Sequence, residues 1–229
     1  MAHLYSQHLA KQYSLQRNRL RATDKRTFAL LKRISIIRKY VLDFGCGDGG
    51  YAMQLSRMGA RKVVGIDISP TMIKLANRNL KKEQIKNVEF MQADGAQLHF
   101  HKNTFDVAFS NFVLHHFQDI SAPLNEISRV LKKSGYLLAT LNAYKVKSRR
   151  FIDAIARSAV PMRLGTGRDS FVVTAFLHTN EDIKSSLIKT GFKVLFYKVV
   201  QNPNAAIDSS YHYINQVSYN SLLFLARKM

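Results

Sequence analysis

The stretch VLDFGCGDGG, residues 41–50, decides the fold of this chain. An apolar run of strand type, Tyr40 to Phe44, breaks into a glycine-dense turn, and a helical pattern of apolar residues follows over 51–58. Gly45 and Gly47 can take positive φ and carry no Cβ, so a ligand can approach their backbone closely. The helix after the turn directs its free N–H groups back into it. We therefore expect a ligand site where this strand ends, as in open α/β sheets.

Asp43 places a carboxylate beside this turn. A glycine-rich turn between a strand and a helix also serves dinucleotides and phosphates, and a tight turn without any ligand is a further alternative. A carboxylate that faces the ligand repels a pyrophosphate but attracts an ammonium group. The motif therefore favours S-adenosyl-L-methionine (SAM), with its α-ammonium and sulfonium groups, over NAD.

Later strand ends add polar and apolar groups to the same site. Asp67 closes a second apolar run about 24 residues after Asp43, where an acid can accept hydrogen bonds from ribose hydroxyls. Ile68 and Met72 are suited to pack on an adenine face, and Ser69-Pro70 predicts a capped helix start. Asp94 follows a third run, 88–92, and can accept from the adenine amino group. Several acidic residues that each follow or end a strand are poorly explained as separate helix caps.

Five segments in this order and spacing resemble the class I SAM-dependent methyltransferases, most of all the quinone-biosynthesis and small-molecule branch. They are VLDFGCGDGG (41–50), VVGIDIS (63–69), QADGAQL (92–98), FDVAFSNFVLHHFQD (105–119) and LNEISRVLKKSGYLLAT (124–140). The resemblance is close over 38–142 and looser over 179–192. It implies SAM as the cofactor, bound by Asp43, Gly45, Gly47, Asp67, Ile68, Met72, Asp94, Gly95 and Asn111. It does not identify the acceptor.

The same chain alternates strand and helix patterns. Strands are expected near 40–44, 62–67, 88–92, 105–110 and 135–141, and helices near 49–58, 70–82 and 121–132. A helix near 181–189 with Asn180 as its N-cap, then strands at 192–200 and 221–225, follow a less regular stretch, 143–178. With the resemblance, this predicts an α/β fold: a doubly wound seven-stranded sheet, mostly parallel with an antiparallel edge hairpin, which is the Rossmann-like methyltransferase fold. We expect one domain over 1–229, divided into a helical cap (1–37), a SAM-binding core (38–142), an acceptor-side insert (143–178) and a C-terminal helix with strands (179–229).

Composition narrows the class of protein. The 229 residues are long enough for a substantial core, and no apolar run reaches the length of a membrane span. The N-terminus lacks the apolar stretch of a secretory signal, and the single cysteine excludes an internal disulfide. A cytoplasmic protein is therefore expected. Cys46 is interpreted as a small residue packed in the cofactor turn and not as a nucleophile.

Positive charge is the second conspicuous feature. The chain has 35 Lys and Arg against 15 Asp and Glu, a net charge of +20. Residues 1–40 and 129–168 each hold ten bases and one acid, and the resemblance places both segments near the acceptor entrance. Three interpretations stay open: an RNA acceptor such as tRNA, an anionic small molecule or one on an acidic carrier, and a basic surface without a partner. Against RNA, residues 110–113 read Ser-Asn-Phe-Val and not the Asn/Asp-Pro-Pro-aromatic loop of amino-methyltransferases, and no RNA-binding module is recognisable.

Methyl transfer from SAM is an in-line displacement at carbon, so alignment of the acceptor and exclusion of water can supply most of the catalysis. A general base helps when the acceptor is a hydroxyl or an amine. The resemblance places His115 and His116 beside the methyl group as candidate bases, with ordinary packing as the alternative. No metal is expected, because some relatives have two glutamates and a histidine where this chain has Phe112, His115 and His116. Other candidates are the aromatics Tyr5 and Tyr13, to close over SAM, and Tyr144, Phe171 and Phe176, to line the acceptor pocket. A non-catalytic SAM-binding protein is the alternative of another class.

Overall fold

The computed structural model describes residues 22–146, 159–164, 171–200 and 217–229. Its elements follow one another along the chain as α2 (Ala22–Arg33), β1 (Tyr40–Phe44), α3 (Gly50–Arg57), β2 (Lys62–Asp67), α4 (Pro70–Glu83), β3 (Val88–Gln92), β4 (Phe105–Asn111), the 3₁₀ turn η1 (Leu114–His116), α5 (Ser121–Val130), β5 (Leu131–Val146), β6 (Ala159–Leu164), β7 (Phe171–Phe176), α7 (Asn180–Lys189), β8 (Phe192–Val200) and β9 (Val217–Lys228).

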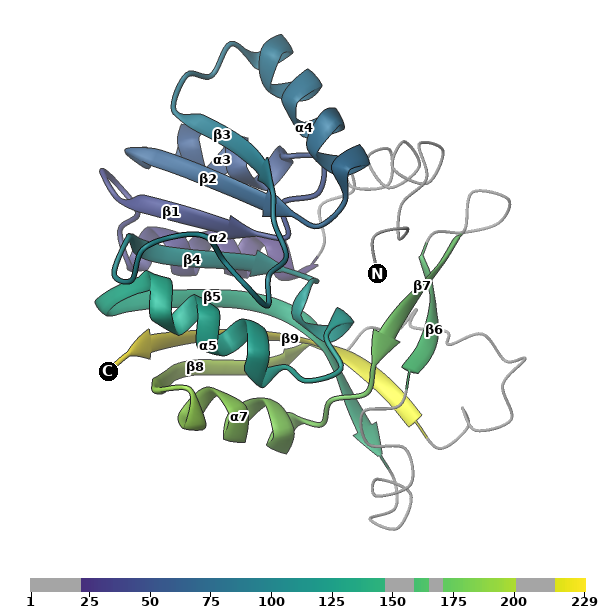
Figure 1. Ribbon diagram of the computed structural model, residues 1–229. Helices are drawn as coiled ribbons and strands as arrows, with labels where there is room; N and C mark the ends of the chain where they lie inside the picture. Colours follow the sequence, from purple (N-terminus) through teal and green to yellow (C-terminus); the bar gives the residue numbers. More distant parts are fainter. Residues whose placement is uncertain (1–21, 147–158, 165–170, 201–216) are drawn as a thin grey trace.

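Seven strands form one sheet in the order β3-β2-β1-β4-β5-β9-β8. The first five strands in this order are parallel, whereas β9 runs antiparallel to both β5 and β8. This confirms the predicted doubly wound sheet with an antiparallel edge hairpin. The strand order reverses between β1 and β4, and a crevice opens at such a switch point beyond the carboxyl ends of the strands. In Figure 1 these strand ends point toward η1 and the β6–β7 hairpin.

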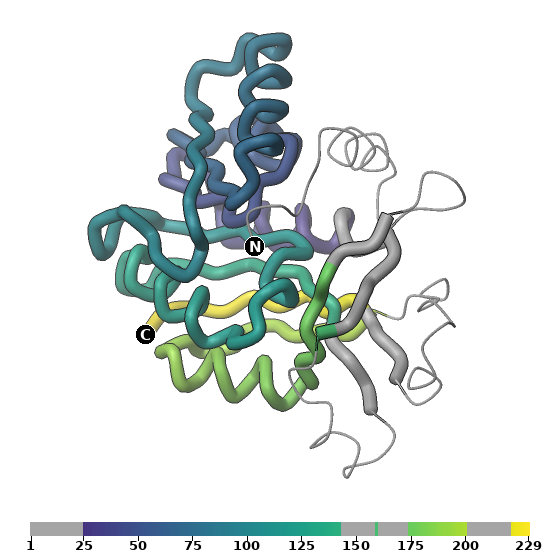
Figure 2. The backbone as a smooth tube through the Cα atoms, turned by 45° about the vertical axis from the view of Figure 1, so that its right-hand side comes forward, coloured from purple at the N-terminus to yellow at the C-terminus, as the bar shows by residue number. Residues whose placement is uncertain are grey.

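Helices cover both faces of the sheet. Figure 1 shows α5 and α7 in front of it and α2 and α3 behind it, and the turned view of Figure 2 shows α4 standing apart from α5 and α7. Because the central strands are buried on both sides, their side chains alternate between two cores: Val41 packs with Leu31 and Leu55, and Leu42 packs with Leu124. Helix α2, part of the segment expected to cap the acceptor side, lies instead on the sheet against β5 and β9.

The two predicted helix starts have different outcomes. Ser69 is the N-cap of α4 and accepts from the backbone N–H of Met72 at 3.3 Å, with Pro70 in the first position, as the sequence predicts. The prediction of Asn180 as the cap of α7 is wrong. Thr179 is the N-cap, because only Thr179 has an acid three residues ahead, and it forms a reciprocal capping box with Asp182.

The stretch expected to be irregular contains regular structure. Strand β5 continues to Val146 and pairs with β9 over its whole second half, from Tyr136↔Arg227 to Val146↔Val217. Strands β6 and β7 form a separate antiparallel pair. These pairings are non-local, which explains why β9 is longer than the predicted 221–225. None of the described helices combines the length and the apolar character needed to cross a membrane.

Candidate cofactor and active site

A cleft lies at the carboxyl ends of β1, β2, β3 and β4, the four neighbouring strands at the switch point. The last residues of these strands and the segments that follow them line it: Phe44, Gly45, Gly47, Ile66, Asp67, Ile68, Met72, Ala93, Asp94, Gly95, Phe112, Val113, His116 and Phe117. Seven of the nine predicted cofactor residues are among them, so parallel pairing brings together groups that are up to 50 residues apart in the sequence.

The turn after β1 has the backbone that its glycines were expected to allow. Gly45, Gly47 and Gly49 all have positive φ, at 76°, 55° and 83°. A Cβ on Gly45 would lie 2.2 Å from the side chain of Val113, which itself lines the cleft. Glycine at position 45 is thus required by the close approach of a neighbouring loop as well as by the backbone angle.

Asp67 is held at the centre of the cleft by backbone donors. Its Oδ2 accepts from the N–H of Gly47 and its Oδ1 from the N–H of Ser69, each at 2.9 Å. Burial raises the pKa of Asp67, and these two hydrogen bonds oppose that effect. A carboxylate accepts about four hydrogen bonds, so two acceptor positions are left for a ligand.

The loop after β3 carries Asp94 and Gly95 into the cleft. Asp94 turns the chain by accepting from the N–H of Ala96 at 2.9 Å, and Gly95 lies against the ring of Phe44, where a Cβ would be 2.2 Å from it. Leu98, four residues beyond Asp94, is buried in the core.

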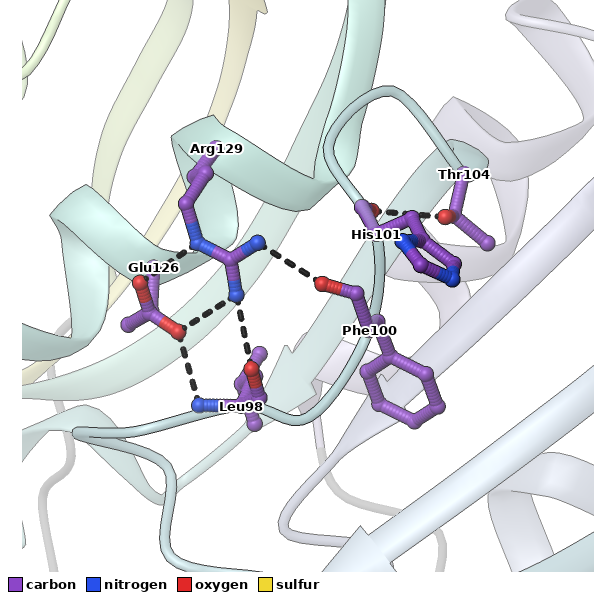
Figure 3. A network of polar contacts seen from close by, with 6 residues as sticks. All are labelled: Leu98, Phe100, His101, Thr104, Glu126 and Arg129. Carbon is purple, nitrogen blue, oxygen red and sulfur yellow. Dashed lines mark hydrogen bonds and ion pairs between the residues drawn. The ribbon is translucent and has the colours of Figure 1, made fainter.

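Figure 3 shows how this loop is fastened to α5. The guanidinium of Arg129 donates to the carbonyl oxygens of Leu98 and Phe100, each at 2.7 Å, and to both carboxylate oxygens of Glu126. Glu126 in turn accepts from the N–H of Leu98 at 2.7 Å. Sequence reasoning assigned no role to this pair, although Glu126 and Arg129 are three residues apart on a helix and can therefore meet.

The two adjacent histidines occupy different environments. His115 is fully buried, and its Nδ1 accepts from the N–H of Asn142 at 3.4 Å, so it does not line the cleft. His116 lines the cleft, and its Nδ1 lies 2.6 Å from the carbonyl oxygen of Thr174 on β7. Burial lowers the pKa of His116, which favours the neutral ring. Of the two candidates, only His116 has access to a ligand.

Two predicted cofactor residues are buried and are not among the residues that line the cleft. Asp43 is 1% exposed near the end of β1, and Asn111, 7% exposed at the end of β4, accepts from the hydroxyl of Thr140. Cys46 is also buried, and burial next to Asp43 and Asp67 raises the pKa of its thiol well above the ordinary value, which keeps it protonated. The described residues contain no group of three or more His, Cys, Asp or Glu that could hold a metal.

Tyr5 and Tyr13 lie outside the described residues. So do the bases of the two basic segments that we expect on the rim of the acceptor entrance: Arg17, Arg19, Arg21, Lys147, Arg149 and Arg150. Tyr144 and Lys145 are placed on β5 and Phe171 on β7 by their backbone, and Phe176 is half-buried at the end of β7 outside the cleft lining.

Comparison with known proteins shows which class of protein this chain resembles. A family model described as a methyltransferase domain matches residues 42–139. The demethylmenaquinone methyltransferase of Lactococcus lactis subsp. lactis (strain IL1403) is 37% identical over 113 residues, 46% of this chain and 45% of the relative. The O-methyltransferase rstn1 of Aspergillus nomiae is 29% identical over 184 residues, 79% of this chain and 76% of the relative.

Among solved structures, phosphoethanolamine N-methyltransferase 2 of Haemonchus contortus superimposes with a TM-score of 0.72 at 22% identity, over 99% of this chain and 59% of that one. That structure contains S-adenosylhomocysteine. The domain at residues 42–139 belongs to the methyltransferase family, and its relatives and fold are those of class I SAM-dependent methyltransferases, whose cofactor is SAM. The match spans less than half the length of the Lactococcus relative.

Proposed function

We propose that this protein transfers the methyl group of SAM to a small-molecule acceptor in the cleft at the ends of β1, β2, β3 and β4. The observation that carries the proposal is that one cleft holds Asp67, with acceptor positions to spare, and His116, whose Nε2 makes no hydrogen bond to a described residue. Asp67 is suited to bind the cofactor, and His116 is suited to take a proton from the acceptor.

The cofactor roles follow from the chemistry of the lining residues. Asp67 would accept from the two ribose hydroxyls, and Asp94 from the adenine amino group. Ile68 and Met72 would pack on the adenine ring, because both are apolar and line the same cleft as these two acids. The backbone of Gly45, Gly47 and Gly95 would allow close approach. Asp43 and Asn111 are buried, so they would act on the cofactor only through the residues around them.

The tautomer of His116 supports a role as general base. A carbonyl oxygen only accepts, so the hydrogen bond to Thr174 requires that Nδ1 carry the proton. The lone pair is then on Nε2, which makes no hydrogen bond to any described residue. A neutral imidazole in this state can take a proton from a hydroxyl or amine acceptor as the methyl group is transferred.

Most of the rate enhancement should still come from alignment. SAM supplies an activated methyl on a sulfonium, whose charge disperses as the new bond forms. The residues around the cleft therefore need to bind, orient and exclude water, with apolar walls from Phe44, Val113 and Phe117.

The acceptor class is a phenol-type or related small molecule, in line with relatives named for demethylmenaquinone and ubiquinone biosynthesis. That the acceptor is anionic or carrier-linked is part of the proposal and rests on the basic segments 1–40 and 129–168. The division of the chain into cap, core, insert and C-terminal part is likewise part of the proposal.

The test is calorimetric titration with SAM, followed by turnover assays on a panel of quinols, other hydroxyl and amine acceptors, and bulk tRNA. We expect SAM to bind and a member of the small-molecule panel to be methylated. SAM binding without turnover on any pool would instead indicate a non-catalytic SAM-binding protein. Methylation confined to tRNA, with an affinity that falls steeply with salt, would indicate an RNA methyltransferase.

A further inference from the structure

Positive charge gathers at the end of the sheet opposite the cofactor cleft. Each of the five parallel strands begins with, or closely follows, an exposed base: Lys86, Arg61, Lys39, Lys102 and Lys133, which belong to β3, β2, β1, β4 and β5. The antiparallel strands bring Arg227 of β9 and Lys193 of β8 to the same edge, because β9 ends where β5 begins and β8 starts beside it. We call this edge, at the left of Figure 1 where the C-terminus lies, the basal edge.

This row of bases crosses the whole sheet. Neighbouring strands are about 4.8 Å apart, so seven strands carry the row over roughly 29 Å. The acids on this edge are already paired within the described structure. Glu89 pairs with Lys62 at 2.8 Å, and Asp106 pairs with Lys132 at 2.9 Å.

At the centre of the basal edge the bases surround a cavity of about 350 Å³. Arg38, Lys39, Arg61 and Lys132 line it, with Asp106 as the single acid. Asp106 is occupied by the N–H of Tyr40 and by Lys132. The other three cations make no ion pair with any described residue. The cavity is therefore an unneutralised cationic site with room for a phosphate group.

Helix dipoles do not explain this arrangement. Bases in the last turns of α2, α3 and α4 complement the negative helix ends and need no other cause. A β-sheet has only a small net dipole, so the bases at the strand ends have no such partner. Arg38 also has a left-handed φ of 58°, an uncommon conformation for a residue other than glycine, and its N–H donates to the carbonyl of Gly59. This turn sets Arg38 beside Arg61.

Exposed apolar side chains lie on the same edge. The described residues include four exposed large hydrophobic side chains, and three of them are here: Ile37, 61% exposed, Ile188, 63%, and Met229, 67%. Ile37 immediately precedes Arg38, and Ile188 and Met229 are joined through the backbone of Gly191 beside β8 and β9. The fourth, Leu195, lies within β8.

We propose that the basal edge docks on an anionic phospholipid membrane surface, with headgroup phosphates at the central cavity and the apolar side chains in the interfacial layer. Lysine and arginine near an anionic leaflet attract it, and apolar side chains add a contribution that salt does not screen. A nucleic acid would use the same cations but would gain nothing from exposed aliphatic side chains, and the aromatic ring at this site, Tyr40, is half-buried under Lys62. Because the cofactor cleft lies at the other end of the strands, its mouth faces away from the bilayer in the docked state.

The chain has no tryptophan, so a single introduced tryptophan reports on its own surroundings. The probes are Ile37→Trp at the basal edge and Gln118→Trp as the exposed control beside the cleft, at the other end of the strands. With vesicles of phosphatidylglycerol and phosphatidylcholine, we expect the emission of Ile37→Trp to shift to shorter wavelength and that of Gln118→Trp to stay unchanged. Vesicles of phosphatidylcholine alone should move neither. No shift at position 37, or an equal shift at both positions, would overturn the proposal.

A second measurement separates this edge from general attraction of a basic protein. Neutralising Lys39 and Lys133 to Gln should lower partition into anionic vesicles by about fivefold per charge removed. Lys74→Gln with Lys198→Gln removes the same charge from exposed positions near the other end of the molecule, and should have a clearly smaller effect. Thermal unfolding checks that each variant is folded. The contrary outcome is that the parent protein binds single-stranded RNA but no vesicles, and that the Lys39 and Lys133 variant loses the RNA binding. This outcome would make the edge a nucleic-acid surface and refute docking on lipid.

Discussion

The Nδ1 atom of His116 lies 2.6 Å from the carbonyl oxygen of Thr174, a residue 58 positions later in the chain. Since the carbonyl can only accept, this contact fixes the neutral tautomer of His116 and leaves the lone pair on Nε2. It also joins η1 to β7, and His178 adds a second link by donating from Nε2 to the carbonyl of Phe117 at 2.7 Å. The β6–β7 hairpin is thus connected to the catalytic side of the cleft.

Replacing His116 with asparagine tests its role as the base. In His116→Asn the shorter side-chain amide can still donate to Thr174 but provides no group in place of Nε2, so we expect kcat to fall by about 10²–10⁴-fold, as for loss of a general base. His115→Asn is the matched control and should keep most of the activity if protein stability is preserved, because His115 does not reach the cleft. Measurable residual turnover is expected in both variants, since alignment supplies most of the catalysis. Complete loss of turnover with SAM still bound would contradict this view.

The pH dependence of kcat/KM should reflect the titration of His116. Burial lowers its pKa in the folded protein, and only the neutral ring can act as a base. Activity should therefore hold as pH falls through 6.5, the ordinary histidine value, and decline only below it. Initial rates between pH 5 and 8 measure this limb, and the His116→Asn variant should lack it. A decline centred at or above 6.5 would argue against His116 as the base.

Asp67 should dominate recognition of the cofactor. Replacing it with Ala removes the charge-assisted acceptor for the ribose hydroxyls, so SAM binding should weaken by roughly 1.5–3 kcal/mol, measured by calorimetry. Asp48→Ala is the control from the same turn, because Asp48 is buried and does not line the cleft. Equal SAM affinity in the Asp67→Ala variant and the parent protein would show that the cofactor site is misplaced.

Gly45 and Val113 should behave as a coupled pair. Gly45→Ala puts a Cβ where it meets Val113 and at a φ of 76°, so it should destabilise the protein by more than about 1 kcal/mol. Val113→Ala should remove the collision but not the backbone strain. Denaturant unfolding of the two single variants and the double variant measures the coupling, and we expect the double variant to be less destabilised than the sum. Simple additivity would mean that the collision is relieved in another way.

Arg129→Lys tests the fastening of the loop after β3. Lysine keeps the charge but cannot bind two carbonyls and a carboxylate together, so the unfolding free energy should fall by about 1 kcal/mol, a value reduced by the partial exposure of the site. SAM affinity should fall as well, because this loop holds Asp94. Arg57→Lys, on an exposed Arg–Glu pair away from the cleft, should change neither quantity measurably. Equal effects of the two substitutions would reduce Arg129 to an ordinary surface ion pair.

The sequence by itself determined the strands β1 to β4, most helices and the cofactor turn, because these depend on local patterns. The glycines of 45–49, the apolar runs of β1–β4 and the Ser69-Pro70 helix start are each read within a few residues. Acids that follow strands were expected at one site because parallel strands end on one edge, and Asp67 and Asp94 do meet there.

Only the tertiary structure separated His115 from His116, since their rings lie 4.4 Å apart but His115 is buried among its neighbours, and the partner that orients His116 comes from β7. Long-range pairing also decided that Asp43 and Asn111 are buried and that β6 and β7 form a hairpin. The same holds for the basal edge. Bases scattered over seven strand ends become one surface only when the sheet forms, because no local pattern encodes which ends lie side by side.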